Sequence, residues 1–489
     1  MKRSVGIALS VLMVLGIVLA ACAPAAAPTP VKVVETKVVE VVKEVPKEVV
    51  VTKEVMVQPT AAPDRIQITW YIGLGAGAQP AQIPLEKAFV EKYNKSQSEI
   101  QLIPVIVDNK YARDNLTAQL AAGNAPDIVG PVGTAGRAAF PGSFLDLQPL
   151  IAKNNYNTGD IDPAFLNFYK VEGELVGLPF AIFPSATYVN VDLFKEAGLD
   201  LPPQKVGDKY TLDGKEMDWD FNTVAALARK LTVDKNGNDA TQAGFDGKNI
   251  VQWGFNMQWN DDPRAFGSFF CAHYPVKDGK ADVPDCWKEA FQWYYDAIWG
   301  PQPFMPSDAA TNSDLLKGNA FSSGKVAMGL THLWYTCCID TKNVKTVDVA
   351  IAPSYNGKIT SKMHGDTFAI MKDSKNPDAA WKVYTYMLNE GAQELYAIYG
   401  GLPARTSQQA EFLAGLDKTF APNKVNWQVF LDMIPFLDAP NHELGLPNNA
   451  KANDAFAKLG GDLRTNDKLD VAKRIADFIT ELDAIYAEK

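Results

Sequence analysis

The chain has 489 residues, and single hydrophobic cores stop growing at roughly 250 to 300 residues, so we expect two lobes or two domains. Hydrophobic residues make up 47% and charged residues 21% of the chain, which is ordinary globular composition and excludes wholesale disorder. The net charge is −10, whereas nucleic-acid-binding proteins are typically basic, so we expect no nucleic-acid partner.

Residues 1–21 have the pattern of a secretory signal peptide. Lys2 and Arg3 precede an uncharged apolar run from Val5 to Leu19, which is too short for a membrane span. The string LAAC, which ends at Cys22, resembles the lipobox of bacterial lipoproteins and implies cleavage before Cys22 and lipidation of that cysteine. We therefore expect an extracytoplasmic protein that is lipid-anchored to the bacterial cell membrane. An ordinary secretory signal that ends near a cysteine is the alternative.

Residues 22–63 are of low complexity and rich in Val, Glu and Lys, without aromatic residues or glycine. Pro46 interrupts the regular pattern. We interpret this segment as an extended stalk that spaces the body from the membrane. A coiled coil is the alternative, although its heptads would not tolerate the proline.

Strand-like and helix-like segments alternate from Arg65 to about residue 132. A buried strand, RIQITWYI, is followed by the helix PLEKAFVEKYNKS, in which Leu85, Phe89 and Tyr93 share one face. The strand EIQLIPVIVD, a helix over residues 111–122 and the strand PDIVGPV follow. This alternation predicts an α/β lobe with a mostly parallel sheet.

The loop GLGAGA (73–78) fits the loose dinucleotide-binding pattern G-x-G-x-x-[GA] after a strand. In a nucleotide fold the helix must begin at once, whereas Gln79 and Pro80 intervene here. We therefore predict a backbone loop that lets a neutral ligand approach a strand end, and we expect no cofactor.

Four cysteines follow Cys22, and an even number in an exported protein suggests disulfides. We favour a bridge between Cys271 and Cys286, which bracket a polar, turn-rich stretch. Cys337 and Cys338 are adjacent and either form a vicinal bridge or stay buried and reduced.

Catalytic signatures are scarce. The histidines, His273, His332, His364 and His442, are isolated along the chain, and neither HExxH nor GxSxG occurs. Asp234, Asn236 and Asn238 occupy alternate positions, like the start of a calcium loop. The residues that follow depart from that pattern, so we favour a polar turn, with bound Ca²⁺ as the alternative.

Several segments together resemble the extracellular solute-binding proteins of ABC importers, in the sugar-binding family that includes maltose-binding protein. These segments are AAGNAPDIVG (121–130), FLDLQPLI (144–151), GLPFAIFPSATYVNVDLFKEAGL (177–199), AFSSGKVAMGL (320–330), AAWKVYTYML (379–388) and GGLPAR (400–405). The resemblance implies an α/β, two-lobe periplasmic-binding-protein fold (type II, maltose-binding-protein-like) with an interlobe cleft. Because the glycine-rich loop departs from the family's best-known member, maltose itself is not assumed.

By this resemblance, residues 179–183 and 347–355 are the crossovers between the lobes. The N-terminal lobe is then assembled from residues 64–180 and 352–402, and the C-terminal lobe from residues 184–348 and 403–489. Hinges of this kind close through small backbone changes in the crossing segments.

Sugar sites need aromatic platforms together with polar groups that pair with hydroxyls. Trp334 falls where the family commonly presents a cleft aromatic, and Gln79 and Arg137 follow strand ends, where α/β sheets collect ligands. For the aromatic residues, burial in a core is the alternative. The candidate ligand-binding residues are Gln79, Arg137, Phe183, Ser185, Trp259, Asn260, Asp261, Trp334 and Asp366.

We therefore expect a monomeric, non-enzymatic receptor that captures a mono- or oligosaccharide by lobe closure and delivers it to the transmembrane subunits of an ABC permease. One alternative is an extracytoplasmic carbohydrate hydrolase, which needs two carboxylates about 5 to 9.5 Å apart. Others are a receptor for a non-sugar solute, such as a peptide or a polyamine, and a structural or adhesive surface lipoprotein.

Overall fold

The computed structural model describes residues 32–38, 50–56, 65–171 and 173–488. The predicted signal peptide (1–21) and the predicted lipidation site, Cys22, lie outside these residues. The chain divides into two compact units, Met1–Arg65 and Ile66–Lys489, and we call the second unit the body.

In the first unit, two strands pair with each other. β1 (Lys32–Val38) and β2 (Val50–Met56) are antiparallel, with Lys32 opposite Met56 and Val38 opposite Val50. Our expectation for residues 22–63, an extended stalk interrupted at Pro46, did not include this pairing.

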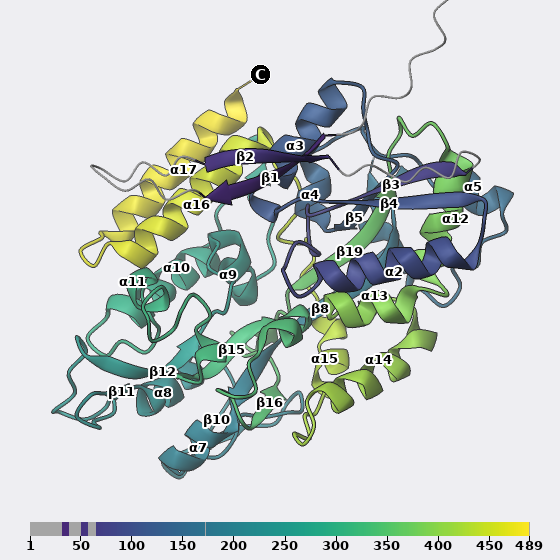
Figure 1. The fold of residues 1–489 in the computed structure, drawn as a ribbon. Helices are drawn as coiled ribbons and strands as arrows, with labels where there is room; N and C mark the ends of the chain where they lie inside the picture. Colours follow the sequence, from purple (N-terminus) through teal and green to yellow (C-terminus); the bar gives the residue numbers. More distant parts are fainter. Residues whose placement is uncertain (1–31, 39–49, 57–64, 172, 489) are drawn as a thin grey trace, which may run out of the picture. The chain divides into compact units, whose positions relative to one another are not determined.

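The body is built on a mixed sheet whose strands follow the order β11-β12-β15-β8-β19-β5-β3-β4 (Figure 1). β3 is parallel to β4 and β5, as the alternating pattern predicted, whereas β19 is antiparallel to both β5 and β8. The strands are β3 (Ile66–Ile72), β4 (Ile100–Ile106), β5 (Ile128–Val132), β8 (Leu178–Asn190), β11 (Val233–Asp234), β12 (Ile250–Asn256), β15 (Val326–His332) and β19 (Met363–Ile370), and β16 (Val347–Ala350) and β20 (Leu402–Pro403) also pair with β8.

β8 is shared by the two halves of this sheet. Residues 178–184 pair with β19 and β20, and residues 185–190 pair with β15 and β16. Every residue of β8 is buried, which explains why the sequence LPFAIFPSATYVN lacks the alternation of a strand with one solvent face.

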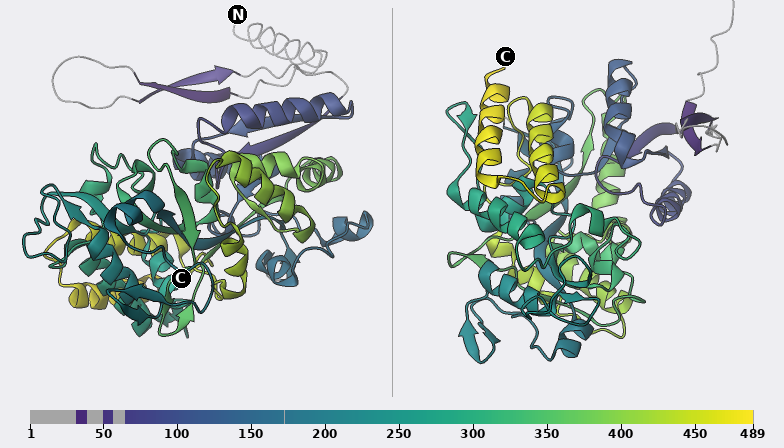
Figure 2. Two further views of the ribbon diagram at one scale, coloured as in Figure 1. Left: turned by 90° about the horizontal axis from the view of Figure 1, so that it is seen from below. Right: turned by 90° about the vertical axis from the view of Figure 1, so that its left-hand side faces the viewer.

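Helices cover the sheet and extend beyond it. α16 and α17 lie side by side and pack on α10, and α13 lies between α2 and α14 (Figures 1 and 2). The longer helices are α2 (Ile83–Ser96), α3 (Asn109–Ala121), α8 (Phe221–Leu231), α9 (Pro263–Phe270), α10 (Asp285–Trp299), α12 (Pro377–Leu388), α13 (Ala392–Tyr399), α14 (Thr406–Thr419), α16 (Asn449–Thr465) and α17 (Val471–Ala487).

Shorter elements connect these. The short helices are α4 (Thr134–Ala138), α5 (Gln148–Lys153), α6 (Pro163–Phe168), α7 (Val191–Ala197), α11 (Asp308–Thr311), α15 (Gln428–Asp432), η2 (Phe321–Ser323), η3 (Leu333–Cys338) and η4 (Ile434–Phe436). The small hairpins are β6 (Lys170–Val171) with β7 (Glu174–Leu175), β9 (Tyr210–Leu212) with β10 (Lys215–Met217), β13 (Val276–Lys277) with β14 (Lys280–Ala281), and β17 (Ser354–Tyr355) with β18 (Lys358–Ile359).

The helix predicted from residue 84 forms as α2, but its buried face differs from the expected one. Phe89 and Tyr93 are buried as expected, whereas Leu85 is 51% exposed and Glu86 is buried in its place. The hydroxyl of Tyr399 donates a hydrogen bond of 2.9 Å to Glu86 Oε1, which partly satisfies the buried carboxyl. Apolar spacing alone could not reveal this contact between α2 and the end of α13.

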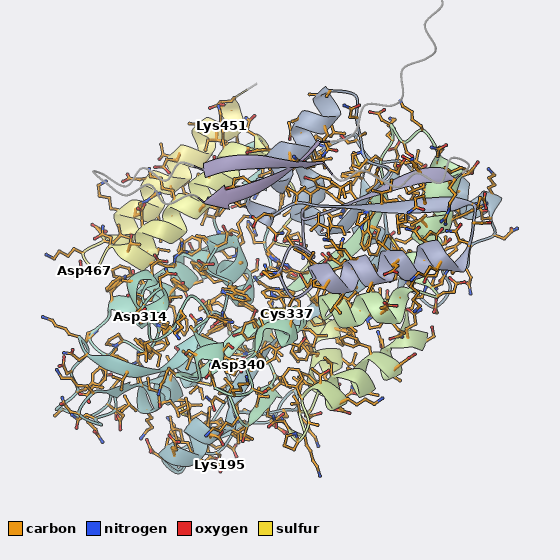
Figure 3. The ribbon with its side chains drawn as sticks, viewed as in Figure 1. Lys195, Asp314, Cys337, Asp340, Lys451 and Asp467 are labelled. Atoms are coloured by element: carbon orange, nitrogen blue, oxygen red, sulfur yellow. A yellow bond between two sulfur atoms is a disulfide. The ribbon has the colours of Figure 1, made fainter. Side chains whose placement is uncertain are left out.

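The favoured bridge between Cys271 and Cys286 is present in the structure. Cys271 caps the C-terminal end of α9 and Cys286 lies in the first turn of α10, with Cα atoms 6.2 Å apart. Cys337 and Cys338 form the vicinal bridge within η3, so the reduced alternative does not hold. Cys337 lies near the middle of the view in Figure 3, and η3 contacts β8.

Candidate functional site

A cleft of about 500 Å³ opens in the body where both halves of the sheet contribute residues. Its walls come from the loop after β3, the start of α4, β8, the loop after β12, η3, β19 and the end of α13. The lining residues are Leu74, Gly75, Ala76, Gly77, Gln79, Gln82, Asn109, Gly133, Ala135, Gly136, Phe183, Trp259, Trp334, Cys337, Cys338, His364, Asp366, Tyr399 and Glu443.

The glycine-rich loop forms one wall of the cleft. The side-chain amide of Asn109 donates hydrogen bonds to the carbonyl oxygens of Gly73 (2.7 Å) and Gly75 (2.6 Å) and so fixes the loop. A Cβ atom on Gly75 would lie 2.6 Å from the carbonyl oxygen of Pro131, so only glycine lets the loop pack this closely on β5. The loop thus lines the cleft with Leu74, Gly75, Ala76 and Gly77.

Two tryptophans form the aromatic part of the lining. The rings of Trp259 and Trp334 are stacked, with centroids 5.9 Å apart and planes 10° apart. Trp259 has a left-handed backbone (φ 55°), its indole nitrogen donates to the carbonyl oxygen of Gly318 at 3.2 Å, and its side chain remains 44% exposed. Tyr335 packs edge-on against Trp259, with ring centroids 5.3 Å apart. The loop is therefore held so that an aromatic face stays accessible.

The carboxyls of Asp366 and Glu443 face the same part of the cleft. A Cβ atom on Gly133 would lie 3.4 Å from Asp366 Oδ1 and 3.5 Å from Glu443 Oε2, so Gly133 gives both carboxyls room. Burial, reinforced by Glu443, raises the pKa of Asp366 to about 7, while Arg137 opposes this shift. Burial would also raise the pKa of Glu443, but His364, His442 and Lys362 together lower it below its ordinary value.

Five of the nine candidate ligand-binding residues line the cleft: Gln79, Phe183, Trp259, Trp334 and Asp366. Asn260 lines a neighbouring hollow of about 260 Å³, where the buried ammonium of Lys362 donates to Asn260 Oδ1 at 2.6 Å. The amide nitrogen of Asn260 also donates to the carbonyl oxygen of Leu330 at 3.1 Å, so both polar atoms of its side chain already form hydrogen bonds within the protein.

Arg137, Ser185 and Asp261 are not among the residues that line either hollow. The guanidinium of Arg137 is buried over the ring of Tyr169, 4.7 Å from its centroid, and burial lowers its pKa. The hydroxyl of Ser185 donates to the carbonyl oxygen of Lys362 at 2.9 Å. Asp261 forms an ion pair of 3.0 Å with Arg464 on α16.

The tentative calcium ligands form a hydrogen-bonded turn. Asp234 Oδ1 accepts from the backbone amides of Asn236 (2.8 Å) and Asn238 (3.0 Å), and Oδ2 accepts from the amide of Asp246 (2.8 Å). The side-chain amide of Asn238 also donates to Asp234 Oδ2 at 3.3 Å. Both carboxylate oxygens are thus engaged by the chain itself, which is the arrangement of the polar turn that we favoured.

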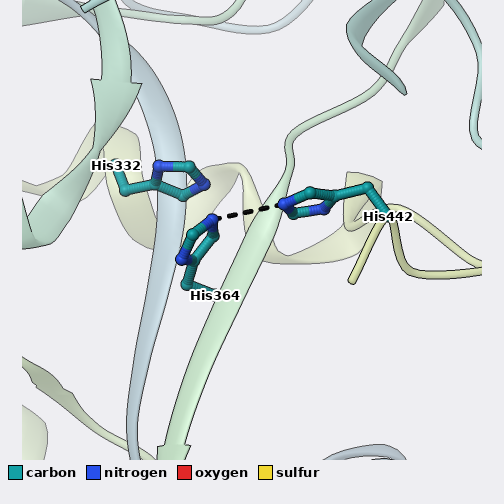
Figure 4. Close-up of side chains that lie close together, drawn as sticks. All are labelled: His332, His364 and His442. Atoms are coloured by element: carbon teal, nitrogen blue, oxygen red, sulfur yellow. Dashed lines mark hydrogen bonds between the residues drawn. The ribbon is translucent and has the colours of Figure 1, made fainter. Parts of the chain in front are cut away.

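Several polar residues of the cleft were not predicted from the sequence, among them Gln82, Asn109, Tyr399 and Glu443. The histidines are isolated along the chain, but His332, His364 and His442 lie together beside the cleft (Figure 4). Burial lowers the pKa of all three imidazoles. Their proximity depends on the register of β15 and β19 on β8 and on the docking of the segment that carries His442, which no local motif reveals.

Within the described part of the chain, no helix combines the length and the apolar character that crossing a membrane requires.

Comparisons with known proteins agree with this architecture. The chain is 24% identical to the mannitol-binding protein of Pseudomonas aeruginosa. The match covers 62% of this chain and 66% of that protein, which is just under two thirds of its length. An ABC substrate-binding protein from Listeria monocytogenes in complex with cycloalternan has a TM-score of 0.65 at 19% identity, over 87% of this chain and 100% of that chain. The sugar-binding protein MalE from Xanthomonas citri has a TM-score of 0.64 at 16% identity, over 86% of this chain and 97% of that one.

These solved structures show that the body has the α/β, two-lobe fold of the maltose-binding-protein type, as the resemblance implied. Residues 79–394 match the family described as bacterial extracellular solute-binding protein. Since this match covers well over half of the chain, the chain belongs to the bacterial extracellular solute-binding proteins.

Proposed function

We propose that the protein is the receptor of an ABC importer and that it captures a neutral sugar or sugar alcohol in the cleft. The observation that carries this proposal is the stacked pair Trp259 and Trp334 beside amide and carboxyl groups in a cleft of about 500 Å³. Aromatic faces suit the apolar C–H faces of a sugar, and the surrounding polar groups suit its hydroxyls. The solutes named for the relatives, mannitol and cycloalternan, belong to the same chemical class.

Most polar groups that line the cleft are neutral, which supports hydroxyl recognition, while the lining also holds the carboxyl of Glu443, whose pKa lies below its ordinary value. Gln79 and Asn109 contribute neutral amides, Tyr399 a hydroxyl and Asp366 a carboxyl whose pKa is raised to about 7. Carboxyls and amides accept hydrogen bonds from sugar hydroxyls, and amides also donate hydrogen bonds to them. A solute that lacks a matching hydroxyl leaves a buried polar group without a partner, which costs free energy and so disfavours that solute.

Capture requires the lobes to close over the solute, and β8 is our candidate for the linking strand. Residues 178–184 pair with one half of the sheet and residues 185–190 with the other, which supports a crossover at 179–183. β16 returns beside the second half of β8, which supports a second crossover within 347–355. We propose that one lobe consists of residues 64–180 and 352–402 and the other of residues 184–348 and 403–489. Closure would then change the backbone conformation of the two crossovers.

The N-terminal region is proposed to attach the receptor to the membrane. Residues 1–21 would be removed as a signal peptide, lipid on Cys22 would anchor the mature chain, and residues 22–63 would space the body from the bilayer. The receptor would work as a monomer and pass its solute to the permease subunits.

The receptor is proposed to be non-enzymatic, and the named relatives are binding proteins. A hydrolase is the rival hypothesis, because Asp366 and Glu443 face one part of the cleft. Incubation of the purified protein with maltose or cycloalternan separates the two. Release of new reducing ends, lost in both Asp366→Asn and Glu443→Gln, would establish the enzyme instead.

A thermal-shift screen of the purified full-length protein tests the proposed solute class. A ligand that binds only the folded state raises the midpoint of unfolding in proportion to the logarithm of its concentration. The panel contains mannitol, maltose, cycloalternan and monosaccharides, with peptides and polyamines as rival solutes. We expect a shift with at least one sugar or sugar alcohol, whereas a shift with peptides or polyamines alone would overturn the solute class.

A further inference from the structure

Strand register brings together two histidines that are far apart in the sequence, and a docked loop adds a third. β15 and β19 flank β8, and their residues His332 and His364 pair with Ser185 and Phe183, which are two positions apart on β8. Because strand residues two positions apart point to the same face, the two imidazoles come to one side of the sheet. Their ring centroids are 3.9 Å apart.

The third histidine arrives on a segment docked against the start of β19. Asp438 fixes this segment, because its Oδ1 accepts from the amide of Met363 at 2.8 Å and its Oδ2 accepts from the amide of His442 at 2.9 Å. Figure 4 shows His442 approaching His364 from a loop, with the Nε2 atoms of the two rings 3.2 Å apart.

The arrangement of nitrogen atoms matches what a metal ion requires. One ring nitrogen from each histidine lies within 4.8 Å of the other two. Nitrogen ligands placed tetrahedrally at 2.0 to 2.1 Å from Zn²⁺ lie about 3.3 Å apart, which is close to the separation of His364 and His442.

His332 gives an independent reason to expect a ligand. Its side chain is fully buried, and neither Nδ1 nor Nε2 has a hydrogen-bond partner among the residues that the structure describes. Buried polar atoms without partners are rare and costly in folded proteins. A bound cation facing this ring would satisfy one of the two nitrogens.

Carboxylates stand behind the histidines, as they commonly do in metal sites. Asp438 Oδ2 lies 2.7 Å from Nδ1 of His442, which fixes Nδ1–H toward the carboxylate and leaves the Nε2 lone pair directed at His364. Glu443 Oε1 lies 3.7 Å from Nδ1 of His364, and Glu443 Oε2 is buried without a hydrogen-bond partner in the described chain. The nearby ammonium of Lys362 disfavours a bound cation, and the negative charges of Asp438 and Glu443 offset this effect.

We propose that His332, His364 and His442 bind one divalent first-row transition-metal ion, with Zn²⁺ as the best match to a three-imidazole set. Three protein ligands leave a fourth position open. His364 lines both the cleft and the neighbouring hollow, so this position lies at the border of the solute site. Ca²⁺ and Mg²⁺ prefer oxygen ligands and do not compete. The proposal does not depend on the identity of the solute.

The test is a calorimetric titration of the chelator-treated, full-length protein with ZnCl₂ in the absence of sugar. We expect one ion per chain, no heat with CaCl₂ or MgCl₂, and an affinity reduced at least tenfold in His332→Ala, His364→Ala and His442→Ala. His273→Ala is the matched control, because His273 lies outside the cluster and contacts Asp282 at 3.1 Å. Its affinity for Zn²⁺ should equal that of the wild type.

Two results would overturn the proposal: wild-type protein that binds no Zn²⁺, and folded His332→Ala protein that binds it as tightly as wild type. If the variants do not fold, the absorption spectrum of the wild-type protein with Co²⁺ decides instead. Ligand-field bands without thiolate-to-cobalt charge transfer support histidine ligation, whereas a charge-transfer band would assign the ion to cysteine and contradict the site.

Discussion

Trp259 and Trp334 lie with their ring planes 10° apart and their centroids 5.9 Å apart, although they come from loops that follow two different strands. β12 and β15 are parallel neighbours, with Phe255 paired to Met328, so both strands deliver the following loop to the same edge of the sheet. This relationship places the aromatic platform at the carboxyl ends of adjacent strands, where α/β sheets bind ligands.

Trp334→Ala should weaken sugar binding by about tenfold to hundredfold, because a stacked indole contributes about 1.5–3 kcal/mol of buried apolar contact. Titration calorimetry with the sugar that gives the largest thermal shift measures the change. Trp259→Ala should have an effect in the same direction.

The matched control for Trp259→Ala is Tyr111→Ala, since Tyr111 is an aromatic residue of similar exposure outside the lining of the cleft. Its affinity for sugar should match that of the wild type. Equal loss in Tyr111→Ala and Trp259→Ala would show that the tryptophans act only through general stability.

Glu86→Gln should remove a pH dependence of stability. Burial raises the pKa of Glu86 from 4.5 to about 7, while the hydrogen bond from Tyr399 opposes this shift. Because its pKa is raised, Glu86 binds its proton more tightly in the folded protein than in the unfolded chain. The contribution of Glu86 to the free energy of unfolding is therefore greatest below pH 4.5 and falls as the pH rises to about 7. The loss should amount to about 1 to 3 kcal/mol.

Urea denaturation at a series of pH values measures this effect, and Glu86→Gln should be more stable than wild type at pH 8. Glu91→Gln is the control, because Glu91 lies on the exposed side of the same helix and pairs with Lys95. A Glu86→Gln protein with the same slope between pH 5 and 7 as wild type would contradict the assignment to Glu86.

The double variant Cys271→Ala/Cys286→Ala should lose about 2–4 kcal/mol of unfolding free energy, because the bridge closes a loop with a sequence separation of 15 residues. Denaturant unfolding of the oxidised protein measures the loss. Alkylation of the denatured, non-reduced wild type should modify none of Cys271, Cys286, Cys337 and Cys338, and labelling of the last two would contradict the vicinal bridge.

Phe183→Ala should lower both stability and sugar affinity, because Phe183 is 2% exposed and belongs to the core as well as to the cleft lining. The expected loss of stability is about 3–5 kcal/mol. Phe183→Leu keeps most of the volume and should lose about 1–2 kcal/mol while still weakening binding. Unchanged affinity in Phe183→Leu would assign the residue to the core alone.

Much of the local structure could be predicted from the sequence, because it depends on local patterns. The alternation after Arg65 predicted β3, α2, β4, α3 and β5 in the correct order. The turn-rich stretch between Cys271 and Cys286 indicated their bridge. Trp334 was singled out through the family resemblance, and Trp259 because it follows a strand-like segment.

What the sequence did not reveal depends on contacts between distant segments. Burial of Glu86 needs the hydroxyl of Tyr399, and the grouping of His332 with His364 needs the register of both strands on β8. Arg137 follows the end of β5, yet its buried side chain lies over the ring of Tyr169. Position along the chain gave the neighbourhood of these residues but not the direction of their side chains.

The most direct test of the central claim is a titration of the full-length protein and of the Trp259→Ala/Trp334→Ala double variant with neutral sugars and sugar alcohols. We predict saturable binding of one sugar molecule per wild-type chain and a loss of affinity of at least a hundredfold in the double variant, with the far-ultraviolet circular dichroism unchanged. Binding of no sugar by the wild type, or equal affinity in the folded double variant, would contradict the assignment of this cleft as a sugar site.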